Sequence, residues 1–127
     1  MTVDVGRVGE FIAAARIEMA GWRAVPAAAD GVDLVAMRDD RVVRVQVKAT
    51  SILIGATRYQ FSTSRGRDRR VLSRDDCDVV SLVCTDIGRC IFRRVEDVPL
   101  KTTTIQLCVM TAEAEAASFQ KSFEVTK

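Results

Sequence analysis

The sequence contains no histidine among its 127 residues, and this absence excludes several classes of enzyme at once. Ser-His-Asp and Cys-His catalysis both use an imidazole as the general base. One-metal nucleases with a histidine base, and zinc sites ligated by histidine, are excluded for the same reason. A catalytic site in this chain would therefore rely on other side chains, such as carboxylates and lysines.

The sequence also lacks any C-x-x-C pair, although it contains four cysteines. Structural zinc sites usually use such close pairs, so a zinc site built from four isolated cysteines is the less favoured alternative. The spacing instead predicts buried free thiols. The four residues are Cys77, Cys84, Cys90 and Cys108.

Long apolar segments are missing as well. No apolar run approaches the roughly 20 residues that span a bilayer, and the N-terminus, with Asp4 and two glycines before its apolar segment, does not resemble a secretory signal. Hydrophobic residues make up 48% of the chain and charged residues 28%, which is typical of a globular protein. We therefore expect a single domain over residues 1–127, located in the cytoplasm and without membrane contact.

A β-hairpin is predicted between residues 33 and 48, where two strand-like stretches flank the polar turn Arg38-Asp39-Asp40. In the second stretch, residues 41–48, alternate side chains point to opposite faces, so Val43, Val45 and Val47 share one face. Gln46 and Lys48 share the other, about 7 Å apart along the strand. The hairpin also sets the start of the first strand beside the end of the second. Asp33 is therefore expected close to Gln46 and Lys48.

An acid, an amide and a lysine in this arrangement have a chemical use. The Asp33 carboxylate and the Gln46 amide oxygen can ligate Mg²⁺, which takes oxygen ligands and usually keeps several waters. An ammonium such as that of Lys48 can orient or deprotonate a water and stabilise charge on a phosphate. The sequence therefore predicts a metal-assisted phosphodiesterase that uses Mg²⁺, with Mn²⁺ as a substitute.

Residues 5–20 are predicted to form a helix that Gly21 ends. Glu10 lies on a stripe of small residues that suits close packing on a sheet, and a carboxylate there is less typical of a solvated surface group. A surface glutamate near the helix start is the alternative. A second stripe at helical spacing comprises Val5, Val8, Ile12, Ala15 and Met19, whereas Glu10 lies beside Gly6, Ala13, Ala14 and Ile17.

These motifs resemble the PD-(D/E)xK nuclease superfamily, in the variant in which glutamine replaces the second acid. Gly6-Arg7-Val8-Gly9-Glu10, followed by Asp33 and then Gln46-Val47-Lys48, is similar to archaeal Holliday junction resolvases. The Gln-x-Lys motif is also similar to a branch of intron homing endonucleases. Pro26 does not adjoin Asp33, so the "PD" of the name is not literal here, and Asp30 is a second candidate for the acid.

The resemblance implies a function and a set of roles. Glu10, Asp33, Gln46 and Lys48 would be catalytic, with the first three holding the metal. The fold would be α/β, a single domain whose central mixed sheet is flanked by helices, as in a restriction-endonuclease-like core. The substrate would be DNA, branched or duplex, with a preference for Holliday-type junctions, and the protein would form a homodimer or higher homo-oligomer. The alternative is a noncatalytic DNA- or protein-binding module that keeps the nuclease fold, because Gln46 carries no charge.

Positive charge is concentrated between residues 64 and 74, which hold five arginines and one aspartate. Phosphate contacts from arginine and lysine supply most of the nonspecific affinity for DNA, so this stretch predicts a loop that holds the DNA backbone. A solvated loop is the alternative. The predicted DNA-binding residues are Arg58, Arg65, Arg67, Arg69 and Arg70.

The remaining elements are predicted from apolar patterns and turn residues. Strands are expected at residues 22–25, 57–62, 79–84, 90–95 and 103–110. Thr111 is expected to cap a final helix that covers the sheet or an oligomer contact. Its apolar stripe comprises Ala112, Ala116, Phe119 and Phe123.

Overall fold

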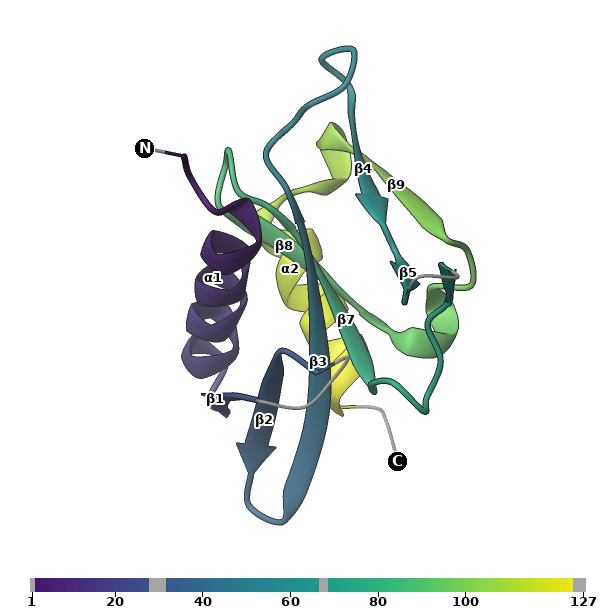
Figure 1. Cartoon of the computed structure of the whole chain (residues 1–127). Coiled ribbons are helices and arrows are strands. Elements are labelled where there is room, and N and C mark those ends of the chain that lie inside the picture. The colour runs from purple at the N-terminus through teal and green to yellow at the C-terminus, as the bar shows by residue number, and fades with distance from the viewer. Residues whose placement is uncertain (1, 28–31, 67–68, 125–127) are drawn as a thin grey trace.

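A five-stranded sheet forms the centre of the computed structural model, which describes residues 2–27, 32–66 and 69–124. Its strands are β1 (Arg23–Pro26), β2 (Leu34–Arg38), β3 (Arg41–Thr50), β7 (Val79–Cys84) and β8 (Arg89–Arg94). They lie side by side in the order β1-β2-β3-β7-β8 (Figure 1). Neighbours are antiparallel except β3 and β7, which are parallel, so the mixed α/β sheet is confirmed.

The predicted hairpin between residues 33 and 48 is present as β2 and β3. Leu34 pairs with Val45, and the ladder continues to Arg38 opposite Arg41. Alternate residues of both strands, including Leu34 and Val45, belong to a core on one face of the sheet. The neighbours of these residues in the sequence therefore face the other side.

The helix α1 (Val5–Met19) packs against β3 through its small residues. Ala13 and Ile17 of the stripe beside Glu10 are buried, as is Gly9, which agrees with the expected packing of that stripe on the sheet, whereas Met19 of the other stripe is 81% exposed. The reason is the close approach at Gly9, where an added Cβ would lie 2.6 Å from the Cβ of Ala49. A stripe of larger side chains would hold the helix too far from the sheet.

The helix α2 (Ala112–Phe119) covers the same face of the sheet and continues into a π-helical segment, Gln120–Glu124. Thr111 caps it by accepting a hydrogen bond from the Ala114 backbone N–H, as predicted. Phe119 and Phe123 are buried and stack with ring centroids 4.1 Å apart. Ala112 and Ala116 are exposed, so that half of the predicted stripe is wrong.

A second, smaller layer covers the opposite face of the sheet (Figure 1). It consists of β4 (Arg58–Ser62) paired with β9 (Thr102–Gln106). The strand predicted to run to residue 110 ends at Gln106, because the chain turns there into a 3₁₀ helix, Leu107–Val109. A short hairpin of β5 (Ser64–Arg65) and β6 (Arg70–Val71) follows β4.

Three of the four cysteines are buried free thiols, as predicted, but Cys108 is exposed. It lies in the 3₁₀ helix that replaces the end of the predicted last strand, which turns its side chain out of the core. Within the described residues, no helix is long and apolar enough to cross a membrane.

The close approach at Gly9 gives a stability prediction. Gly9→Ala is expected to lower the free energy of unfolding by about 1–3 kcal/mol, because the new methyl group overlaps Ala49. Gly6→Ala is the matched control, since its nearest neighbour would be the Asp4 side chain at 3.6 Å. Urea unfolding of both variants is the measurement. A Gly9→Ala protein as stable as the wild type would contradict the packing described.

Candidate active site

Asp33 lies at the point where β2 and β3 begin to separate. Its backbone N–H donates to the carbonyl oxygen of Val45 at 2.9 Å. Its Oδ2 accepts a hydrogen bond from the backbone N–H of Val47 at 2.7 Å. Because the side chain continues the ladder in place of a backbone carbonyl, the carboxylate is fixed beside β3 at the level of Gln46.

Gln46 faces the side of the sheet opposite the two helices. It pairs in register with Val80 of β7, which belongs to the core under β4 and β9. The residue is only 9% exposed, and its Oε1 is buried with no hydrogen-bond partner among the described residues. A buried amide oxygen without a donor costs about 1–3 kcal/mol. This oxygen is therefore available to a donor or a cation.

Lys48 lies two residues further along β3, on the same face as Gln46. Its side chain is half-buried, and Nζ donates to the carbonyl oxygen of Ser64 at 3.2 Å. Burial lowers the pKa of Lys48, the nearby charge of Arg65 lowers it further, and Asp33 opposes the shift. The neutral amine, which can accept a proton from water, is thus easier to form here than in a free lysine.

Glu10 approaches the same cluster from α1. Partial burial raises the pKa of Glu10, and the carboxylates of Asp33 and Asp4 raise it further, while Arg7 opposes them. A cation bound beside Glu10 would favour the ionised form of its carboxyl, which burial and the neighbouring charges disfavour.

The donor atoms fit a hard divalent cation. They are carboxylate and amide oxygens, the type that Mg²⁺ prefers, and the unpartnered Oε1 of Gln46 is one of them. In the part of the chain that the structure describes, no three side chains of histidine, cysteine, aspartate or glutamate form a metal-binding group. A metal bound here would use the Gln46 oxygen together with Asp33 and Glu10.

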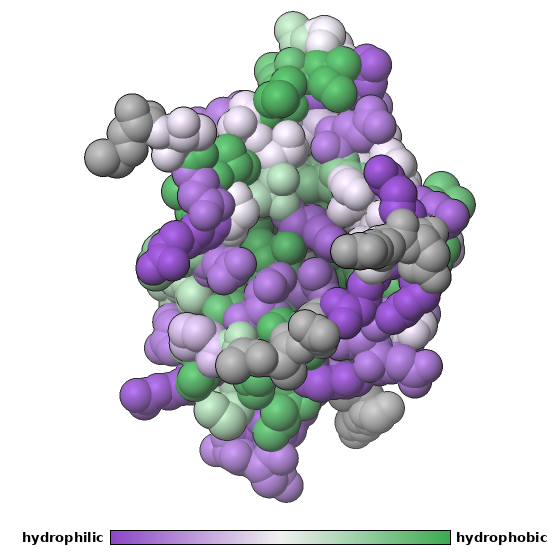
Figure 2. Space-filling model, viewed as in Figure 1, coloured by the Kyte–Doolittle hydropathy of each residue, from purple (hydrophilic) through white to green (hydrophobic). Residues whose placement is uncertain are grey.

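Four of the five predicted DNA-binding arginines lie in the part of the chain that the structure describes. Arg58 and Arg69 are exposed, in β4 and at the turn of the β5–β6 hairpin. Figure 2 shows the face, with hydrophilic residues gathered between α1 and this hairpin. Arg65 and Arg70 both form ion pairs with Asp76. Arg67, and the alternative acid Asp30, lie outside the described residues.

Sequence reasoning missed two residues of this region. Ser64 contacts Lys48 through its backbone carbonyl, and the type of residue does not indicate such a contact. Asp76 could have been found from the sequence, because an acidic run, Asp75-Asp76, directly follows the arginine-rich stretch. Opposite charges so close in sequence indicate ion pairs within the loop.

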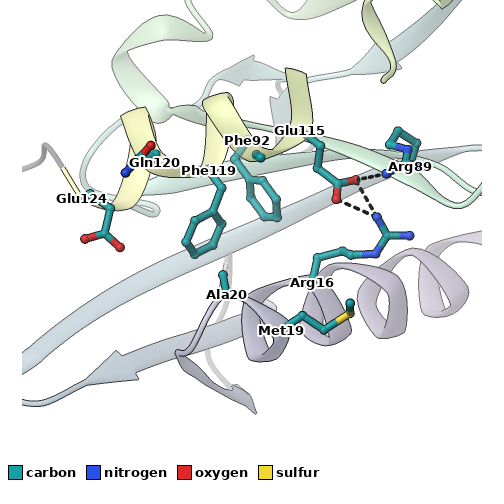
Figure 3. A pocket seen from close by; sticks show the side chains of 10 residues that line it. Arg16, Met19, Ala20, Arg89, Phe92, Glu115, Phe119, Gln120 and Glu124 are labelled. Atoms are coloured by element: carbon teal, nitrogen blue, oxygen red, sulfur yellow. Dashed lines mark hydrogen bonds and ion pairs between the residues drawn. The ribbon is translucent and has the colours of Figure 1, made fainter. Parts of the chain in front are cut away.

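A pocket of about 630 Å³ lies on the other face of the sheet, between α1 and α2. Phe92 and Phe119 line its apolar part (Figure 3). At one end, Glu115 pairs with Arg16 at 2.6 Å and with Arg89 at 3.7 Å, which ties both helices to β8. None of the four predicted catalytic residues lines this pocket.

The ion pairs of Asp76 give a pH prediction. The hydrogen bond from Arg70 lowers the pKa of Asp76 to about 2, with burial opposing it. The stabilising contribution is therefore present above the unfolded pKa of about 4 and is lost as the pH falls towards 2. Asp76→Asn is expected to lower the free energy of unfolding by roughly 2 kcal/mol at neutral pH. In urea unfolding experiments, the difference in free energy of unfolding between the variant and the wild type should shrink below about pH 3. A difference that stays constant with pH would contradict this role.

The comparisons with known proteins agree with the fold. A family model described as PD-(D/E)XK endonuclease matches residues 1–125. No curated protein matches. Among solved structures, a bacterial homing endonuclease, I-Ssp6803I, is similar with a TM-score of 0.68 and 18% sequence identity, covering 83% of this chain and 76% of that one. This likeness supports a restriction-endonuclease-like fold. The match over nearly the whole sequence shows that the chain belongs to the PD-(D/E)XK endonuclease family.

Proposed function

We propose that this protein is a metal-dependent DNA endonuclease that hydrolyses phosphodiester bonds on the sheet face of Asp33, Gln46 and Lys48. The observation that carries this proposal is the buried, unpartnered Oε1 of Gln46. It lies on β3 between a carboxylate fixed by the Val47 N–H and a half-buried lysine. The large majority of buried side-chain oxygens have a hydrogen-bond partner, so this one is a candidate ligand for a cation.

Each side chain has a defined task in this proposal. Asp33, Gln46 and Glu10 would hold Mg²⁺, or Mn²⁺ in its place. A divalent ion bound there would neutralise phosphate charge and make a bound water more acidic. Lys48 orients the attacking water through Nζ, and its lowered pKa makes it a suitable acceptor for the proton of that water.

The arrangement of the elements favours recognition of DNA shape over base sequence. Among the described residues, α1 contributes only Glu10 to the proposed site, and both α1 and α2 pack mainly on the sheet face opposite Lys48, so neither helix is placed to enter a major groove there. Contacts would come from Arg58 and Arg69 to phosphates, which position DNA without reading bases. Branched DNA is therefore the proposed preferred substrate, cut by a homodimer with two sites, and duplex DNA is the second candidate. The structural likeness to a homing endonuclease supports the proposal of an endonuclease.

Cleavage assays test the proposal directly. Labelled four-way junction, linear duplex and single strand would be incubated with the protein in Mg²⁺ and in Mn²⁺. Metal-dependent cleavage is expected, fastest on the junction, and Lys48→Ala should slow it at least about 100-fold because general acid–base catalysis contributes about 10²–10⁴.

Lys121→Ala is the matched control for charge, because Lys121 is exposed in the segment that follows α2, away from the site. It should cleave at the wild-type rate. Preferred cleavage of duplex would retain the nuclease and overturn the junction preference. DNA binding without any cleavage would instead favour the noncatalytic module.

Replacing Gln46 should raise the stability of the metal-free protein and remove the stabilisation by metal. Gln46→Leu removes a buried acceptor, so the metal-free protein should become more stable by about 1–3 kcal/mol. The same change should abolish the rise in melting temperature that Mn²⁺ causes in the wild type. Asp33→Asn should also abolish that rise, and Asp39→Asn, in the exposed turn between β2 and β3, should keep it.

Differential scanning fluorimetry with and without Mn²⁺ measures both effects of Gln46→Leu. A full metal response in this variant would show that Gln46 is not a ligand. A loss of stability in the metal-free variant would show that its oxygen is satisfied in the native protein.

A further inference from the structure

A buried carboxylate outside the four predicted catalytic residues joins the two strands of the β5–β6 hairpin. Asp76 is 6% exposed, and its Oδ1 lies 2.7 Å from Nη2 of Arg70 and 3.1 Å from Nε of Arg65. Its Oδ2 accepts a further hydrogen bond from Nη1 of Arg70 at 2.8 Å. Because Arg65 and Arg70 are directly opposite each other in the hairpin, one carboxylate holds both strands.

The same carboxylate is fixed relative to the central sheet. The backbone N–H of Ser73 donates to Oδ2 of Asp76 at 3.0 Å. Two residues after Asp76, the backbone N–H of Asp78 donates to the Arg44 carbonyl at 2.9 Å, and the Arg44 N–H donates to the Asp78 carboxylate at 2.8 Å. Asp76 is therefore positioned by β3, the strand that carries Gln46 and Lys48.

The hairpin in turn contacts Lys48. Ser64, which precedes Arg65, accepts the hydrogen bond from Nζ of Lys48 at 3.2 Å through its backbone carbonyl. We propose that Asp76 is a positioning residue: through Arg65 and Arg70 it holds the Ser64 carbonyl against Lys48 and so fixes the direction in which Nζ points. This inference rests on the proposed role of Lys48 in the reaction.

The hairpin is anchored at its flanks by the buried residues Thr63 and Leu72, and Asp76 holds the part between them. Its ladder comprises only two pairs of residues, and an isolated ladder of that length is unstable in water. Arg65 and Arg70 carry like charges at directly opposed positions, which separates strands unless an anion lies between them. In Asp76→Asn, the Ser64 carbonyl would lose this support, and both guanidinium groups would lose the negative charge that competes with DNA phosphates for them.

A positioning role of Asp76 and a purely structural role predict different effects of Asp76→Asn on cleavage and on DNA binding. Asp76→Asn is expected to slow single-turnover cleavage at least tenfold at saturating DNA. Its affinity for DNA, measured in Ca²⁺ by fluorescence anisotropy, should stay equal to that of the wild type or become tighter. If Asp76 had only a structural role, its replacement would reduce the fraction of active protein. The amplitude of single-turnover cleavage would then fall, and the rate constant would not.

Glu115→Gln is the matched control. Glu115 is also a mostly buried carboxylate that pairs with two arginines, but it lies on the helix face of the sheet (Figure 3). It should cleave within about threefold of the wild-type rate constant. Equal slowing in both variants, or weaker DNA binding by Asp76→Asn in proportion to its slower cleavage, would overturn the inference.

A readout without DNA separates this inference from the proposed function. The ¹³Cε–¹Hε NMR signal of Lys48, assigned with Lys48→Arg, should shift in Asp76→Asn and stay in place in Glu115→Gln. An unchanged signal in Asp76→Asn would overturn the positioning role. If the wild type cleaves none of the substrates, the proposed function fails, and the shift of the Lys48 signal still decides whether Asp76 positions that side chain.

Discussion

The hydrogen bond from the Val47 backbone to the Asp33 carboxylate is the interaction on which the candidate site depends. It occurs where β2 leaves β3, so the side chain of Asp33 replaces the backbone acceptor that the ladder would otherwise supply. The pairing of Leu34 with Val45 sets this position, and the parallel pairing of β3 with β7 buries the neighbouring Gln46. The register of one hairpin thus brings an acid, an amide and a lysine together.

Packing around the cluster shifts the pKa values of two of its side chains. In the proposed site, the close approach of α1 to β3 at Gly9 would bring Glu10 towards the cluster, and burial raises the pKa of its carboxyl. Lys48, half-buried on β3, has a lowered pKa. Both shifts disfavour the charged form in the metal-free protein. Such pKa shifts are common at functional sites. Their cost in stability is offset here by the packed cores on both faces of the sheet.

Local signals explain which parts of this protein are predictable from sequence. Alternation in residues 41–48 and the polar turn before them define the hairpin, and these depend only on near neighbours. On α1, the small residues beside Glu10 indicate the face that packs, but the close contact of Gly9 with Ala49, which is distant in sequence, cannot be deduced from helical spacing. Lys48 contacts the backbone carbonyl of Ser64, and a backbone contact cannot be deduced from the type of residue.

The central claim is that Gln46 supplies a metal ligand, and paramagnetic NMR tests it most directly. Adding Mn²⁺ to protein labelled with ¹⁵N broadens the side-chain amide signals of glutamines near the ion. If Gln46 is a metal ligand, its side-chain signal should disappear first. The signals of the exposed glutamines outside the site should remain; these are Gln60, Gln106 and Gln120. A Gln46 signal that stays sharp while Mn²⁺ supports cleavage would contradict the account.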